Sequence, residues 1–149
     1  MMPSQNCIDL IKKFEGLFLK SYLCPAGVPT IGYGSTMWND GKKVVLGQKI
    51  TLEGAEILLM WELKNKANAL HRLNLNQNQF DALMSFIYNI GISAFLNSTL
   101  FKKALGNQND ITIRDEFMRW NKAKVNGKMI VLKGLNNRRI AESNLYFTI

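Results

Sequence analysis

Cysteine, proline and histidine are scarce in this sequence. Two cysteines, Cys7 and Cys24, are too few for a disulfide framework, which fits a protein made in a reducing compartment, although their pairing is left open. Only three prolines together with 47% hydrophobic residues exclude a disordered polypeptide, and the length is that of one domain, residues 1–149. The single histidine, His71, argues against histidine-based catalysis and against a multi-histidine metal site.

Long apolar runs are also missing. No stretch approaches the roughly 20 apolar residues that a membrane-spanning helix needs. The N-terminal segment 1–14 carries Asp9, Lys12 and Lys13 in an amphipathic pattern, which is unlike a signal peptide. We therefore expect no membrane anchor and no signal peptide.

Acidic residues are few relative to basic ones. Nineteen Lys and Arg against eleven Asp and Glu give a net charge of +8, which favours anionic partners such as nucleic acid, acidic membrane surfaces or bacterial envelopes. The basic residues are scattered along the chain, and no recognised nucleic-acid-binding motif occurs. We therefore expect no nucleic acid partner.

Hydrophobic periodicity predicts helices around a small β region. Apolar residues at i, i+3, i+4 and i+7 predict a helix over 4–14, which Gly16 ends and which places Glu15 at its C-terminal end. The turn-rich segment that follows predicts two or three antiparallel strands, at 17–23, 30–34 and 42–46, the last after an Asn39-Asp40-Gly41 turn. Helical spacing then returns after Thr51, an expected N-cap.

The expected architecture is α+β and mainly helical. Further helices are predicted at 52–70, 78–90, 98–105, 110–120 and 135–147, with a turn at 125–128. The chain would then consist of a small antiparallel β lobe (16–47), a connecting helix (52–70) and a helical lobe (1–14 and 71–149). A cleft between the lobes would be the natural place for an extended substrate.

The spacing of three polar residues carries a resemblance to a known family. Glu15 is followed after eight residues by Cys24 and after five more by Thr30, which opens the segment Thr-Ile-Gly-Tyr-Gly ending at Gly34. This pattern resembles the signature of the phage-type lysozymes, glycoside hydrolase family 24. The similarity continues in short blocks at 79–83, 89–91, 98–100, 119–120, 134–135, 138–139 and 141–142.

The resemblance implies an endolysin that hydrolyses the β-1,4 bond between N-acetylmuramic acid and N-acetylglucosamine in bacterial peptidoglycan. Glu15 would be the general acid, and its place at a helix C-terminus favours the protonated form that this role needs. The other implied site residues are Cys24 and Thr30 for placing the attacking water, Arg138 for supporting the catalytic glutamate, and Gly34, Tyr88 and Asn89 for binding substrate.

Two positions depart from the commoner family pattern: Cys24 replaces an aspartate, and Ser35 replaces a histidine. A thiol with a pKa of about 8.5 is mostly uncharged at neutral pH unless its surroundings lower that value.

Purely structural interpretations of the site residues also remain open. Cys24 could be a loop thiol, Thr30 a strand residue, Arg138 an exposed helix residue and Tyr88 a packing residue. Trp61 and Trp120 are assigned to packing because of their helical spacing.

Alternative functions follow from these open points. The first is a lytic transglycosylase on the same fold, in which no water is needed. From a different class, the chain could be an inactive cell-wall-binding or nucleic-acid-binding module. For the lysozyme we expect no metal and no organic cofactor, a monomer, and storage in the cytoplasm until a holin-like pore releases it to the cell wall or periplasm. Phage, prophage and domesticated sources all remain open.

Overall fold

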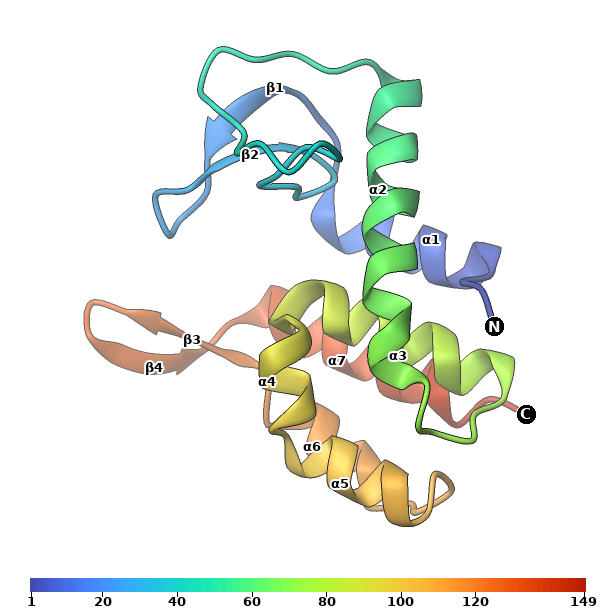
Figure 1. Ribbon diagram of the computed structural model, residues 1–149. Helices are drawn as coiled ribbons and strands as arrows, with labels where there is room; N and C mark the ends of the chain where they lie inside the picture. Colours follow the sequence, from blue (N-terminus) through green and yellow to red (C-terminus); the bar gives the residue numbers. More distant parts are fainter. The chain divides into compact units, whose positions relative to one another are not determined.

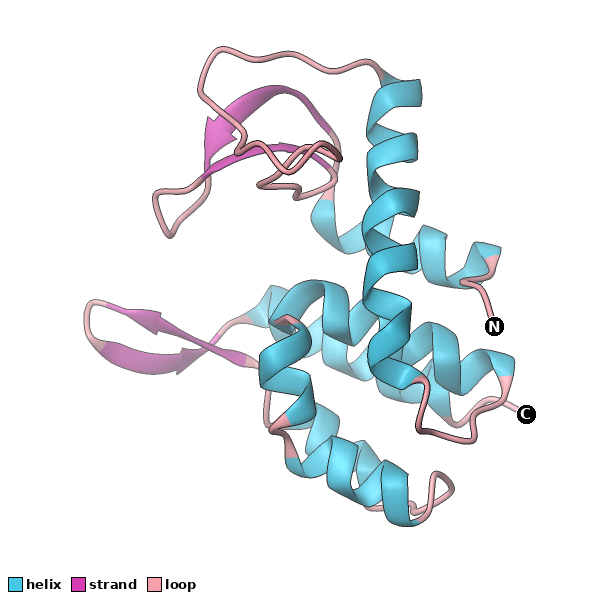
Figure 2. Ribbon diagram, viewed as in Figure 1, coloured by secondary structure: helices cyan, strands magenta, loops and turns pink.

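The computed structural model describes all residues 1–149, which form two compact units. One unit comprises residues 11–65, and the other comprises residues 1–10 and 66–149. Helices predominate, and each unit contains one two-stranded antiparallel sheet (Figures 1 and 2). The predicted α+β class is confirmed, whereas a single domain over residues 1–149 stays a prediction.

The helices are α1 (Gln5–Glu15), α2 (Leu52–Ala67), α3 (Gln77–Ile90), α4 (Ile92–Leu96), α5 (Thr99–Gly106), α6 (Ile113–Met118) and α7 (Lys133–Tyr146), with a 3-10 turn η1 (Asn68–Leu70) after α2. The strands are β1 (Phe18–Leu23), β2 (Pro29–Gly32), β3 (Lys122–Val125) and β4 (Lys128–Val131). None of these helices combines the length and the apolar character that crossing a bilayer requires.

The first helix follows its apolar stripe. Cys7 and Ile11 are fully buried, as their helical spacing predicts. The helix ends where Gly16 adopts a φ of +70°, a left-handed conformation that favours glycine. The Gly16 N–H donates to the Lys12 carbonyl oxygen at 3.0 Å. Glu15 is therefore the last residue of α1, as predicted.

Two of the three predicted strands are confirmed. In the β1–β2 sheet, Tyr22 lies opposite Thr30. The third prediction, a strand at 42–46, is wrong, because Lys43 forms only an isolated bridge with Met37. The chain turns again immediately afterwards, where Gly47 has a φ of +92°, so no ladder can extend from the bridge.

The core of the 11–65 unit contains a cluster to which this loop region contributes Val44. It is formed by Ile31, Val44 and Leu58, against which Trp38 and Trp61 pack. The predicted packing role of Trp61 is thus confirmed. The indole N–H of Trp38 donates to the Gln48 side chain at 2.9 Å, so its polar group is also paired.

Helix α3 is the central element of the other unit. Every residue from 79 to 87 is buried, and α7 packs against this helix while α6 packs against α7. Its start is fixed by a capping box in which the Asn76 side chain accepts the Gln79 N–H at 2.8 Å. Trp120 contacts Phe86 edge to face, with ring centroids 5.9 Å apart, which confirms its predicted packing role.

Several helix limits differ from the predictions. The helix predicted at 52–70 ends at Ala67 and continues as η1, and the helix predicted at 110–120 is confined to α6. The start of α6 is delayed because Asp110 forms a turn in which its side chain accepts the Thr112 N–H at 2.9 Å. Helices predicted at 78–90, 98–105 and 135–147 are confirmed as α3, α5 and α7.

Two elements were not predicted. One is the short helix α4, which begins directly after Gly91. The other is the β3–β4 hairpin, of which only the turn at 125–128 was predicted. That turn contains two residues with positive φ, Asn126 at +50° and Gly127 at +79°, the conformation that two-residue hairpin loops favour.

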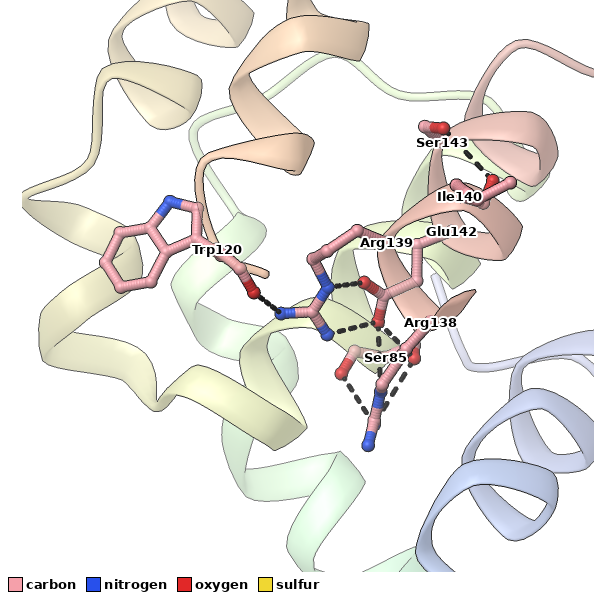
Figure 3. Close-up of polar contacts among 7 residues, drawn as sticks. All are labelled: Ser85, Trp120, Arg138, Arg139, Ile140, Glu142 and Ser143. Carbon is pink, nitrogen blue, oxygen red and sulfur yellow. Dashed lines mark hydrogen bonds and ion pairs between the residues drawn. The ribbon is translucent and has the colours of Figure 1, made fainter. Parts of the chain in front are cut away.

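A buried ionic cluster joins α3 and α7 (Figure 3). The Glu142 carboxylate lies 2.6 Å from Arg139 Nε and 3.3 Å from Arg138 Nε, and it accepts the Ser85 hydroxyl at 2.6 Å. Burial raises the pKa of Glu142, while the two guanidinium groups and the Ser85 hydrogen bond oppose that change. Arg138 is only 3% exposed, so its interpretation as an exposed helix residue is wrong.

Candidate active site

Glu15 and Gly34 are in close contact within the 11–65 unit. Gly34 has a φ of +87°, and a Cβ atom built on it would lie 2.6 Å from Glu15 Oε2. The absence of a side chain at Gly34 is therefore what lets the backbone after β2 approach the carboxylate. Gly34 was predicted to bind substrate; the structure adds a direct steric relation to the predicted acid.

The last turn of α1 is held against α2 by an ion pair. Lys12 Nζ lies 2.8 Å from Glu56 Oε1 and 5.3 Å from the centre of the Tyr33 ring. The hydrogen bond that Lys12 donates to Glu56 raises the pKa of Lys12. Because Lys12 is three residues before Glu15, these contacts restrain the helical turn that carries the predicted acid.

Cys24 lies in the tight loop between β1 and β2. The Cys24 N–H donates to the Val28 carbonyl oxygen at 3.0 Å, and the Gly27 N–H donates to the Cys24 carbonyl oxygen at 2.8 Å. The pKa of the Cys24 thiol is lowered, chiefly by a backbone hydrogen bond from Val28, with smaller effects from Ala26 and the Thr30 hydroxyl. The loop therefore favours the thiolate, and both cysteines are free thiols.

Thr30 is buried next to this loop. Its side chain is 4% exposed, and Oγ1 donates to the Val28 carbonyl oxygen at 2.9 Å. The same hydroxyl is within hydrogen-bonding reach of the Cys24 thiol. Since a hydroxyl has one proton, Thr30 can donate either to Val28 or to a Cys24 thiolate, but not to both at once. The structure thus brings Cys24 and Thr30 together.

Tyr22 connects the two parts of the site and was missed from the sequence. It is the cross-strand partner of Thr30, and its pKa is raised by burial and by the negative charges of Glu15 and Cys24. No signal within the sequence singles it out, because its pairing with Thr30 depends on the register of the hairpin. Glu15 and Cys24 are therefore each within electrostatic range of Tyr22.

The other predicted site residues belong to the second unit. Arg138 lies on α7, where its guanidinium donates to the Ser85 carbonyl oxygen at 3.1 Å as well as contacting Glu142. Tyr88 and Asn89 lie near the end of α3, Tyr88 partly buried and Asn89 exposed. That Arg138 supports Glu15, and that Tyr88 and Asn89 bind substrate, stay predictions.

The two cysteines are expected to react very differently with iodoacetamide. Cys24 is partly exposed with a lowered pKa, whereas Cys7 is fully buried and its pKa is raised by burial and by the charges of Asp81 and Glu142. Because the thiolate is the reactive form, Cys24 should be alkylated first at neutral pH in the folded protein, and peptide mass spectrometry would locate the label.

Two controls make this measurement specific. In denaturant both cysteines should react at similar rates, because unfolding removes both environments. Thr30→Val keeps the size of the side chain but removes the hydroxyl, so it should slow alkylation of Cys24 and leave Cys7 unchanged. Equal labelling of Cys7 and Cys24 in the folded wild type would contradict the prediction.

Comparison with known proteins identifies relatives along almost the whole chain. Residues 12–142 match the family described as phage lysozyme. The endolysin of Acyrthosiphon pisum secondary endosymbiont phage 1 is 43% identical over 150 residues, covering 98% of each chain. The solved endolysin from Escherichia coli O157:H7 phage FAHEc1 is 41% identical with a TM-score of 0.89, covering 99% of this chain and 94% of that one.

A bacterial protein domain is similar as well. The muramidase domain of SpmX from Asticaccaulis excentricus is 35% identical with a TM-score of 0.84, and the match covers 98% of this chain and 97% of that domain. Similarity at this level thus extends to phage and bacterial proteins alike.

Proposed function

Because this chain belongs to the phage lysozyme family, we propose that Glu15, Cys24 and Thr30 carry out its reaction. The protein is a glycosidase that hydrolyses bacterial peptidoglycan, as its endolysin relatives indicate. We further propose that it cleaves the β-1,4 bond between N-acetylmuramic acid and N-acetylglucosamine, in line with its similarity to a muramidase domain.

The contact between Glu15 and Gly34 is the observation that carries the proposal for the acid. Cleavage of a glycosidic bond requires a carboxylic acid that protonates the leaving oxygen. Glu15 is partly buried at the end of α1, and glycine at position 34 leaves the carboxylate oxygen uncovered by a side chain from that direction. A sugar oxygen could then approach the acid along the backbone of this segment.

Cys24 and Thr30 are proposed to hold the attacking water. A thiolate accepts hydrogen bonds and a hydroxyl both donates and accepts them, so the pair can orient a water molecule and withdraw its proton. The lowered pKa of Cys24 supports this role, because it increases the fraction of thiolate at neutral pH. Attack by water on the face opposite the leaving group would invert the configuration at the sugar.

The fate of water during the reaction tests the hydrolytic mechanism. In oxygen-18 water, wild-type digestion of purified peptidoglycan should place one labelled oxygen in every new reducing end, and mass spectrometry would detect it. A transglycosylase would instead yield anhydro-muropeptides without label, which would overturn the role given to Cys24 and Thr30. Thr30→Val should reduce the rate of label incorporation, whereas Cys24→Asp, which supplies a carboxylate, should retain it.

We propose that Arg138 supports the catalytic glutamate and that Tyr88 and Asn89 bind substrate. We propose in addition that the protein is a monomer stored in the cytoplasm of the producing cell and released to the peptidoglycan through a holin-like pore. Isolated peptidoglycan should then be digested without any partner protein, whereas intact cells should lyse only when the pore is supplied.

A further inference from the structure

The β3–β4 hairpin extends away from the helices of its unit (Figure 1). Seven of its eight strand residues are exposed, Ala123 being the partly buried exception. A two-stranded hairpin is at best marginally stable by itself in water, and sheets normally cover at least one face. Both faces of this hairpin are therefore accessible to a partner.

Charge is concentrated in this element. Residues 122–133 contain four lysines and no acidic residue, in a chain whose net charge is +8. The lysines are Lys122, Lys124, Lys128 and Lys133. Three of these lysines lie on β3 and β4, and Lys133 begins α7, so the hairpin carries positive charge with no acidic residue to offset it.

Large apolar side chains are exposed beside these lysines. Met129 is 63% exposed, Ile130 is 44% exposed and Val131 is 51% exposed. The strand register pairs Lys124 with Met129 on one face and Ala123 with Ile130 on the other, because directly opposed residues share a face. Each face of the hairpin therefore combines positive charge with apolar surface.

We propose that the β3–β4 hairpin docks the protein on an anionic lipid surface. Because Met129 and Ile130 lie on opposite faces, the hairpin would enter by its 125–128 turn. The lysines would then contact the lipid phosphates, while Met129 and Ile130 would enter the boundary between headgroups and acyl chains. This combination favours lipid over a polyanion such as nucleic acid, because a polyanion could neutralise the lysines but would leave both apolar side chains in water. The surface would keep the enzyme concentrated close to the bacterial envelope.

Vesicle binding tests the proposal directly. Wild type should co-sediment with vesicles of equal parts phosphatidylglycerol and phosphatidylcholine but not with pure phosphatidylcholine vesicles. The double variant Lys124→Glu with Lys128→Glu should bind at least about 25-fold more weakly, since each lysine near an anionic surface contributes about fivefold. Added salt should weaken wild-type binding, because screening reduces the attraction.

Two further variants separate the contribution of the hairpin to vesicle binding from that of net charge, and the contribution of its apolar side chains from that of its lysines. Lys42→Glu with Lys43→Glu, at exposed positions of the other unit, changes the net charge equally and should keep most of the binding. Met129→Ser with Ile130→Ser keeps every charge and should bind more weakly than wild type. If the Lys42 and Lys43 variant loses as much affinity as the hairpin variant, or if the serine variant binds like wild type, the proposal is overturned.

Activity on lipid-free peptidoglycan distinguishes lipid binding by the hairpin from binding of the glycan substrate. The Lys124 and Lys128 variant should digest purified peptidoglycan at the wild-type rate, because the proposed surface acts on lipid and not on the glycan. A loss of activity on this substrate would assign the hairpin to substrate binding and overturn the lipid proposal. Digestion of the same substrate by wild type tests the proposed function separately, so the two failures are distinguishable.

Discussion

Replacing Glu15 with glutamine should lower peptidoglycan cleavage at least about 100-fold, because a positioned proton donor typically accelerates such reactions 100-fold to 10,000-fold. Glutamine preserves the size of the side chain and can donate a hydrogen bond, but it has no acidic proton to transfer to the leaving oxygen. The loss should appear in kcat, since the proton moves in the transition state. Release of reducing sugars from purified peptidoglycan would measure it.

Glu53→Gln is a matched control for this variant. Glu53 is an exposed glutamate in the first turn of α2, so its replacement makes the same chemical change in the same unit of the protein. Its activity should remain close to that of wild type. Thermal unfolding of both variants should also match wild type. Equal cleavage rates for Glu15→Gln and wild type would remove Glu15 from the proposed mechanism.

Gly34→Ala tests the same site from the backbone side without altering any carboxylate. The new Cβ would lie 2.6 Å from Glu15 Oε2, so either the acid or the segment after β2 must move. The φ of +87° adds strain for any residue with a side chain, on the order of 1 kcal/mol. Activity should therefore fall more than stability. Gly41→Ala has a similar φ of +85° but meets no atom within 4 Å, and Gly41 lies outside the Cys24 loop, so it controls for strain alone.

Replacing Glu142 should produce the largest loss of stability. Glu142→Leu would leave the guanidinium groups of Arg138 and Arg139 buried without their carboxylate, and breaking a buried ion pair in this way typically costs about 3–5 kcal/mol. For a protein of this length, that loss corresponds to a decrease in Tm on the order of 10 °C. Calorimetry at neutral pH would measure the decrease.

A double-mutant cycle tests whether the loss of stability comes from the ion pair between Arg139 and Glu142. Arg139→Met with Glu142→Leu removes both members of the 2.6 Å pair and replaces them with apolar side chains, so it should be more stable than the sum of the two single losses implies. Arg139 also lies over the Phe86 ring at 4.9 Å, a contact that methionine can partly replace. Strict additivity of the two single losses would show that the pair itself contributes little.

Local features of the sequence were sufficient for much of the fold. The spacing of Cys7 and Ile11 placed the buried face of α1, and Gly16 placed its end, because both depend on neighbours within a few residues. The long periodic pattern of α3 was equally clear. The wrong strand at 42–46 had a plausible composition, but a strand exists only where a partner pairs with it, and here the chain turned away at Gly47.

For the candidate site, too, the sequence predicted one part and only the tertiary structure showed the other. The resemblance carried by the spacing of Glu15, Cys24 and Thr30 was enough to select them, and the sequence was also sufficient for the α+β class and the residue types available for catalysis. Only the tertiary structure revealed that Gly34 lies against the Glu15 carboxylate and that Tyr22 is in electrostatic range of Glu15 and Cys24. These relations join separate segments, and periodicity within a single segment carries no information about them.

Burial was likewise decided only by the tertiary structure. Arg138, Arg139 and Glu142 look like an ordinary charged helix surface in sequence, yet all three are buried because α3 supplies Ser85 and apolar cover for α7. The lysines and the large apolar residues of β3 and β4 remain exposed because the hairpin extends away from the helices of its unit. The sequence determined which residues can pair or pack, and the packing of distant elements decided which of them lost contact with water.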